Sequence, residues 1–175
     1  MQPAGEFSSW HANLLRIDRR KCVLFTHDKT LYSFFVAGLT KPHFENIREF
    51  FRQNLFKSLV AETLPQKHIE IFLDDIREIE IAKTNNRSVL GSMNDLTFQL
   101  KYRIAYEGGL LNTDITKLIH DLNRIPMSAI EEIYSIYELR KLLETRLGLT
   151  CIQTHQAIRI GQYLKRLKEA DNNER

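Results

Sequence analysis

The sequence is poor in the residues that support disulfide-rich or membrane-spanning folds. Cysteine occurs only twice in 175 residues, at Cys22 and Cys151, both in apolar surroundings. Because two distant cysteines do not build a disulfide framework, we expect both to be reduced core residues. No run of about 18 apolar residues exists, which excludes a transmembrane helix. Residues 1–9 predict a loose leader without the basic and apolar regions of a signal peptide, so we expect a cytoplasmic protein.

Motifs for nucleotide, metal or acyl chemistry are also missing. The seven glycines form neither a Gly-x-Gly-x-x-Gly pattern nor a phosphate-binding loop, which excludes most dinucleotide-binding and nucleotide-hydrolysing proteins. The six histidines are scattered and lack the spacing of metal ligands. We therefore expect no metal and no cofactor. Ser88 and Ser92 lack the Gly-x-Ser-x-Gly turn of a serine hydrolase.

The charge balance permits contact with nucleic acid without requiring it. Lysine and arginine number 25 against 22 acidic residues, a net charge of +3. Two basic clusters are candidates for contact with nucleic acid or a protein partner. They are Arg16, Arg19, Arg20 and Lys21, and then Arg159, Lys165, Arg166 and Lys168. Either cluster is equally consistent with a solvated surface.

The order of the hydrophobic patterns predicts an α+β fold. Segments 10–17, 22–26 and 31–36 are β-prone and separated by polar turns, which favours an antiparallel meander, and a fourth strand is expected over 79–83. Apolar residues at helical spacing predict five to six helices. They cover about 44–59, 69–76, 89–104, 115–122, 136–147 and 154–168. Strands followed mostly by helices are typical of α+β proteins. We expect one domain over 9–148 and a helical extension with a polar tail over 149–175.

The most distinctive segment, residues 84–98, leads from the fourth expected strand into a helix. Asn86 or Ser88 is expected to cap this helix, because short oxygen-bearing side chains satisfy its free amides. A helix N-terminus beside Arg87 favours binding of an anion. Gly91 costs about 1 kcal/mol in a helix relative to alanine. We therefore expect it to make room for a neighbouring backbone or for a ligand.

Two polar strips flank the apolar face of the same helix. The candidate ligand-binding residues are Asn86, Arg87, Ser88, Gly91, Ser92, Asn94 and Asp95. The favoured alternative is a structural role, in which the same side chains cap the helix and hydrogen-bond to a neighbouring loop. One functional hypothesis is an enzyme that binds an anionic substrate at this strand-to-helix junction.

Three segments carry a family resemblance. They are Thr-Asn-Asn-Arg-Ser-Val-Leu-Gly-Ser-Met-Asn-Asp at 84–95, Trp-His-Ala-Asn-Leu-Leu at 10–15, and Arg-Arg-Lys-Cys-Val-Leu-Phe-Thr at 19–26. They resemble an uncharacterised bacterial domain family, a catalogued domain of unknown function. The resemblance runs from about Ser9 to Leu143, and the stretch after Gly148 looks like an addition. It implies a bacterial origin but no activity.

The preferred hypothesis is therefore a non-enzymatic, cytosolic binding module. Its partner would be a protein or nucleic acid, for instance in a toxin–antitoxin or phage-defence setting. An amphipathic basic helix near the C-terminus offers one face for such a partner. A homodimer is also compatible with the sequence.

Overall fold

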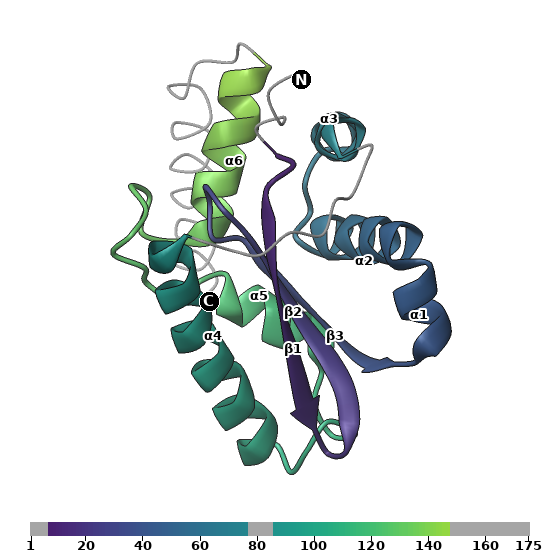
Figure 1. Cartoon of the computed structure of the whole chain (residues 1–175). Coiled ribbons are helices and arrows are strands. Elements are labelled where there is room, and N and C mark those ends of the chain that lie inside the picture. The colour runs from purple at the N-terminus through teal and green to yellow at the C-terminus, as the bar shows by residue number, and fades with distance from the viewer. Residues whose placement is uncertain (1–6, 77–85, 148–175) are drawn as a thin grey trace, which may run out of the picture. The chain divides into compact units, whose positions relative to one another are not determined.

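The computed structural model describes residues 7–76 and 86–147, which contain three strands and six helices (Figure 1). The strands are β1 (Trp10–Ile17), β2 (Arg20–His27) and β3 (Ser33–Leu39). The helices are α1 (Lys41–Glu45), α2 (Ile47–Ala61), α3 (Gln66–Asp75), α4 (Arg87–Tyr106), α5 (Ile115–Leu122) and α6 (Ser135–Arg146). The chain divides into two compact units, Met1–Leu139 and Arg140–Arg175. The strands and α1 to α5 belong to the first.

The three strands form one antiparallel sheet in the order β1-β2-β3, which confirms the predicted meander. Asp18 and Arg19 make the turn between β1 and β2, and both have positive φ, 48° and 63°. This conformation is that of a type I′ turn, whose twist matches the twist of the paired strands. The pairing of Trp10 with His27 and of Ile17 with Arg20 follows from this two-residue turn.

Helices cover both faces of the sheet, because side chains alternate between the two sides along each strand. On one face, Leu15, Cys22 and Leu24 belong to a core that includes Met93 and Leu100 of α4. The opposite face carries an aromatic cluster that joins the sheet to α2 and α3. Its rings include those of Trp10, Phe25, Phe34, Phe51 and Phe72.

The prediction of a buried, reduced cysteine is confirmed for Cys22, and Cys151 lies outside the described residues. Burial raises the pKa of the Cys22 thiol. The thiol is therefore held in its neutral, unreactive form.

Phe7 corrects the prediction of a loose leader over residues 1–9. The side chain of Phe7 is fully buried, and its ring packs on Phe72 with 4.6 Å between ring centroids. Its N–H donates to Asp75 Oδ2 at 3.1 Å, and its carbonyl accepts from Trp10 Nε1 at 2.8 Å. The end of the predicted leader is thus part of the aromatic core. Residues 1–6 are not among those described.

The helices follow the predicted pattern, with one division that was not expected. The single helix predicted over 44–59 is two helices, α1 and α2, which meet at Asn46. Gly108 and Gly109 follow α4 with positive φ, a backbone conformation that glycine commonly adopts where a helix ends. The strand predicted over 79–83 and the helix over 154–168 fall on residues that are not described. None of the described helices is long and apolar enough to cross a membrane.

Candidate functional site

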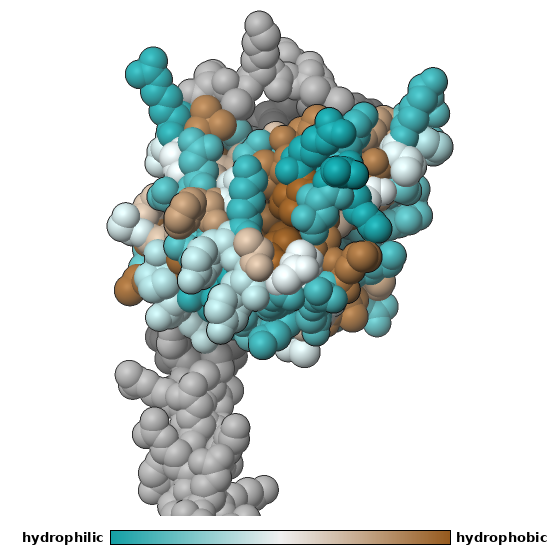
Figure 2. All heavy atoms as spheres, turned by 90° about the horizontal axis from the view of Figure 1, so that it is seen from below, coloured by the Kyte–Doolittle hydropathy of each residue, from teal (hydrophilic) through white to brown (hydrophobic). Residues whose placement is uncertain are grey.

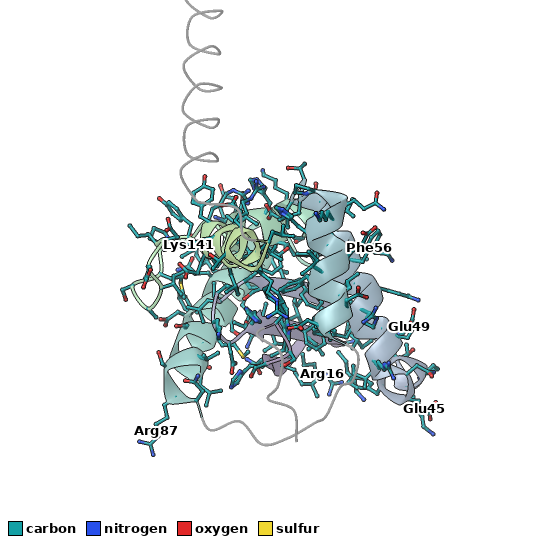
Figure 3. The ribbon with its side chains drawn as sticks, turned by 90° about the horizontal axis from the view of Figure 1, so that it is seen from above. Arg16, Glu45, Glu49, Phe56, Arg87 and Lys141 are labelled. Atoms are coloured by element: carbon teal, nitrogen blue, oxygen red, sulfur yellow. The ribbon has the colours of Figure 1, made fainter. Side chains whose placement is uncertain are left out.

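The candidate residues from the distinctive segment lie at the start of α4. Asn86 caps this helix, since its Oδ1 accepts a hydrogen bond from the Val89 N–H at 3.3 Å. Arg87 is exposed and extends outward from the end of α4 in Figure 3. Ser88, Asn94 and Asp95 are exposed as well, whereas Ser92 is buried. Most of these polar groups therefore face solvent.

Gly91 is exposed, and the described residues give no steric reason for a glycine there. A Cβ built on Gly91 would meet no atom of the described residues within 4 Å outside the adjacent turns of its own helix. Gly109 behaves differently, because its φ is 105° and its Cβ would lie 2.8 Å from Asp18 Oδ2. The sequence predicted that Gly91 makes room either for a neighbouring backbone or for a ligand. Within residues 7–76 and 86–147, no neighbouring backbone approaches Gly91 closely.

The exposed face of α4 continues from Gly91 into a row of aromatic side chains. Phe98, Tyr102 and Tyr106 are 68%, 61% and 83% exposed. The rings of Tyr102 and Tyr106 are stacked, with centroids 6.5 Å apart and planes 18° apart. Residues three and four apart share one face of a helix. We call Gly91, Asp95, Phe98, Tyr102 and Tyr106 the α4 stripe.

Sequence reasoning missed the aromatic part of this stripe. The spacing of Phe98, Tyr102 and Tyr106 was visible, but the core-facing pattern of Val89, Met93, Leu96 and Leu100 had already explained the helix. The core face of the helix was already complete, so aromatic residues on another side of it indicated an exposed apolar surface.

The first basic cluster comes together at the β1–β2 turn. Its four side chains, Arg16, Arg19, Arg20 and Lys21, are all exposed. Asp18 in the turn accepts a hydrogen bond from the Leu110 N–H at 2.7 Å, which holds the turn against the segment after α4. Figure 2 views the molecule from this end, where hydrophilic side chains surround a central group of hydrophobic residues. The second basic cluster lies outside the described residues.

A small pocket of about 170 Å³ lies between α2 and α5, beside β3. Phe34, Phe35 and Ile119 give it an apolar lining, while the exposed Lys57 and His120 supply polar groups. Pockets for small-molecule ligands commonly hold about 300 Å³ or more. The space suits a single side chain of a partner or a few water molecules better than a substrate.

The buried polar groups that line this pocket are already paired within the protein. Glu62 is only 3% exposed, and Arg124 donates to both of its carboxylate oxygens, at 3.1 and 2.8 Å. The two-point contact offsets the cost of burying the carboxylate. The hydroxyl groups of Ser58 and Tyr32 are 2.6 Å apart and bond to each other. The Glu62–Arg124 pair joins the end of α2 to the segment after α5, and the Ser58–Tyr32 bond joins α2 to the residue before β3. The partners are far apart along the chain, so the sequence alone did not predict these pairs.

Ser9, His11 and Asp28 form a further cluster beside the sheet. Asp28 lies in the centre, where it accepts from the Ser9 hydroxyl at 2.5 Å and pairs with His11 Nδ1. In a hydrolase triad the histidine lies between the serine and the carboxylate. The present order does not place an imidazole on the serine oxygen. Within the described ranges, no three His, Cys, Asp or Glu side chains are placed to hold a metal ion.

Comparison with known proteins identifies the family but no activity. A family model described as a domain of unknown function, DUF6933, matches residues 1–138. The match ends next to the boundary of the first compact unit, Met1–Leu139. No curated protein and no solved structure matches the chain. The predicted resemblance to a catalogued domain of unknown function is thus confirmed: the chain belongs to the DUF6933 family.

Proposed function

We propose that the chain is a non-enzymatic protein-binding module whose contact surface is the α4 stripe. The exposure of Phe98, Tyr102 and Tyr106 in one row carries this proposal. Aromatic side chains are enriched at protein interfaces and supply much of their binding energy. Three neighbouring exposed rings on one helix therefore favour a surface that a partner covers.

The polar start of α4 supports the same proposal over an enzymatic site. Arg87 and Asp95 are exposed to solvent, which favours contact with a partner surface over an enclosed anionic substrate. Electrostatic stabilisation of a reaction requires groups held in a site that excludes water. The proposal includes a bacterial cytosolic setting, with a toxin–antitoxin or phage-defence protein among the partners to be considered.

Site-specific photo-crosslinking in the native host tests the proposal. A photoreactive phenylalanine analogue replaces Tyr102 in one variant and Phe56 in a matched control. Phe56 is 48% exposed and lies on α2, away from the stripe (Figure 3). We expect a discrete protein adduct from position 102 and none from position 56. Equal labelling at both positions, or no adduct at position 102, would contradict the proposal.

A second candidate function, contact with nucleic acid, rests on the four exposed cations at the β1–β2 turn. Neutralisation of phosphates releases counterions, so binding should weaken steeply as salt increases. We expect an Arg19→Gln, Arg20→Gln variant to lose binding to a mixed-sequence oligonucleotide. An affinity that is unchanged by salt or by this substitution would remove nucleic acid from consideration.

A further inference from the structure

We infer that the α4 stripe binds a second copy of this chain, with the two α4 helices antiparallel and packed about a twofold axis beside Phe98. This inference rests on the proposed function, because it names the partner of the same surface. The supporting observations are the spacing of the stripe, its charges and the open space at Gly91.

The α4 stripe of one protomer is complementary to the same stripe on a second, antiparallel α4 helix. Its five positions fall within an arc of about 80° on the helix, given 3.6 residues per turn. An antiparallel partner centred beside Phe98 places Gly91 opposite Tyr106, and Asp95 opposite Tyr102. Each small or acidic residue of one helix thus meets an aromatic residue of the other. A twofold interface requires this self-complementarity.

Gly91 gains a physical role in this arrangement. A Cβ added at Gly91 would meet no other part of residues 7–76 and 86–147 within 4 Å, so this side of the helix has free space relative to the described residues. Gly91 and Tyr106 are about 22 Å apart along the axis, because each residue rises 1.5 Å. In the antiparallel pair, both ends of the contact therefore consist of a tyrosine ring over a glycine backbone.

Charges along α4 are compatible with the pairing. The Tyr102 hydroxyl of one protomer is placed to donate to the Asp95 carboxylate of its partner. The two Asp95 carboxylates are offset by about 10 Å along the axis, since positions 95 and 102 face each other. At that separation, exposed like charges are largely screened at physiological salt. Lys101, which is exposed beside the stripe, lies near Asp95 of the partner in this register, because position 101 faces position 96.

The area of the contact predicts a weak, reversible dimer. The exposed parts of the three aromatic side chains amount to roughly 400 Å² per protomer. Interfaces that bury less than about 1,200 Å² in total are generally transient. We therefore expect a dissociation constant of the dimer in the micromolar range or higher.

Sedimentation equilibrium over a wide concentration range measures this association in the full-length chain. We expect a monomer–dimer equilibrium that weakens at least about tenfold in a Phe98→Ala, Tyr102→Ala variant. The Phe56→Ala variant is the matched control and should associate like the wild type. A wild-type protein that stays monomeric at every concentration would overturn the inference, as would equal weakening by the control.

Thiol crosslinking tests the antiparallel register. All variants carry Cys151→Ser, and Cys22 is buried. Under oxidation, Phe98→Cys should crosslink with itself, whereas Gly91→Cys and Tyr106→Cys should crosslink only when mixed. Self-crosslinking of both Gly91→Cys and Tyr106→Cys would indicate a parallel pair and overturn the proposed arrangement. Circular dichroism of each variant confirms that the fold is retained.

The mass of the photo-adduct at position 102 separates this inference from the proposed function. An adduct with twice the mass of the chain supports both. An adduct with a different protein, together with a monomer in sedimentation, retains the binding module and rejects the homodimer. A chain that is monomeric in sedimentation and forms no adduct at position 102 contradicts both the homodimer and the binding module.

Discussion

Asn123 hydrogen-bonds to both backbone polar groups of Ser33. Its Oδ1 accepts from the Ser33 N–H at 2.8 Å, and its Nδ2 donates to the Ser33 carbonyl at 2.8 Å. The side-chain amide thus pairs with the start of β3 as a neighbouring strand would. Asn123 Oδ1 also accepts from the Ser135 hydroxyl at 2.9 Å. One buried amide therefore ties the sheet to the end of α5 and the beginning of α6.

Replacement of Asn123 should destabilise the fold strongly. Asn123→Ala leaves a buried N–H and a buried carbonyl of Ser33 unsatisfied, and each costs about 1–3 kcal/mol. We expect a loss of about 2–5 kcal/mol in the free energy of unfolding, measured by urea denaturation. Asn123→Asp retains the acceptor but not the donor, so it should not restore stability. A loss below about 1 kcal/mol would contradict the assigned role.

The Glu62–Arg124 pair should show strong coupling in a double-mutant cycle. Arg124→Ala leaves the carboxylate of Glu62 buried and without the guanidinium, a change that costs about 3–5 kcal/mol. Glu62→Gln removes the buried charge, so the double variant should lose clearly less stability than the sum of the two single variants. Thermal and urea unfolding of all four proteins measure the coupling. Additive losses would mean that the two side chains act independently.

Asp121 should contribute to stability only where its carboxyl is ionised. Its partial burial alone would raise the pKa, but hydrogen bonds from His120 and Arg103 outweigh burial and hold the pKa of Asp121 below its usual value. A lowered folded-state pKa gives stability that is present above the unfolded pKa and lost as the pH falls through the folded pKa.

The comparison of wild type with Asp121→Asn tests this pH dependence. At about pH 6 the variant should be less stable by a few tenths to about 1 kcal/mol, because the pair is partly exposed. At about pH 2.5 the carboxyl is largely protonated in the unfolded chain. The difference in stability between wild type and variant should therefore be smaller than at about pH 6. A difference that is constant over this range would show that Asp121 acts through packing instead of charge.

Gly91→Ala should stabilise the monomer. The position is helical and open, so alanine adds helix propensity worth about 1 kcal/mol without steric cost. Gly109→Ala is the matched control, and it should destabilise because its φ is 105° and Asp18 lies too close. Urea denaturation at low protein concentration measures both. Destabilisation by Gly91→Ala would mean that glycine is required within the monomer.

Local patterns were sufficient to predict much of the secondary structure. The β-prone residues at 10–17 and 22–26 and the polar residues between them predicted the hairpin, and the strand pairing and the turn with Asp18 and Arg19 confirmed it. The short side chains beside the helical pattern predicted Asn86 or Ser88 as the cap, and the structure shows that Asn86 is the cap. The division between α1 and α2 was missed, because Phe44 and Ile47 continue the apolar spacing across Asn46.

The sequence by itself determined the α+β class, the meander, the core face of α4 and the absence of familiar catalytic motifs. Each of these depends on residues that are close along the chain. Only the tertiary structure decided that Phe7 enters the aromatic core, that Asn123 pairs with Ser33, and that Arg124 meets Glu62. It also decided that Phe98 faces solvent. These relationships depend on which surfaces remain covered after distant segments pack, and local periodicity does not contain that information.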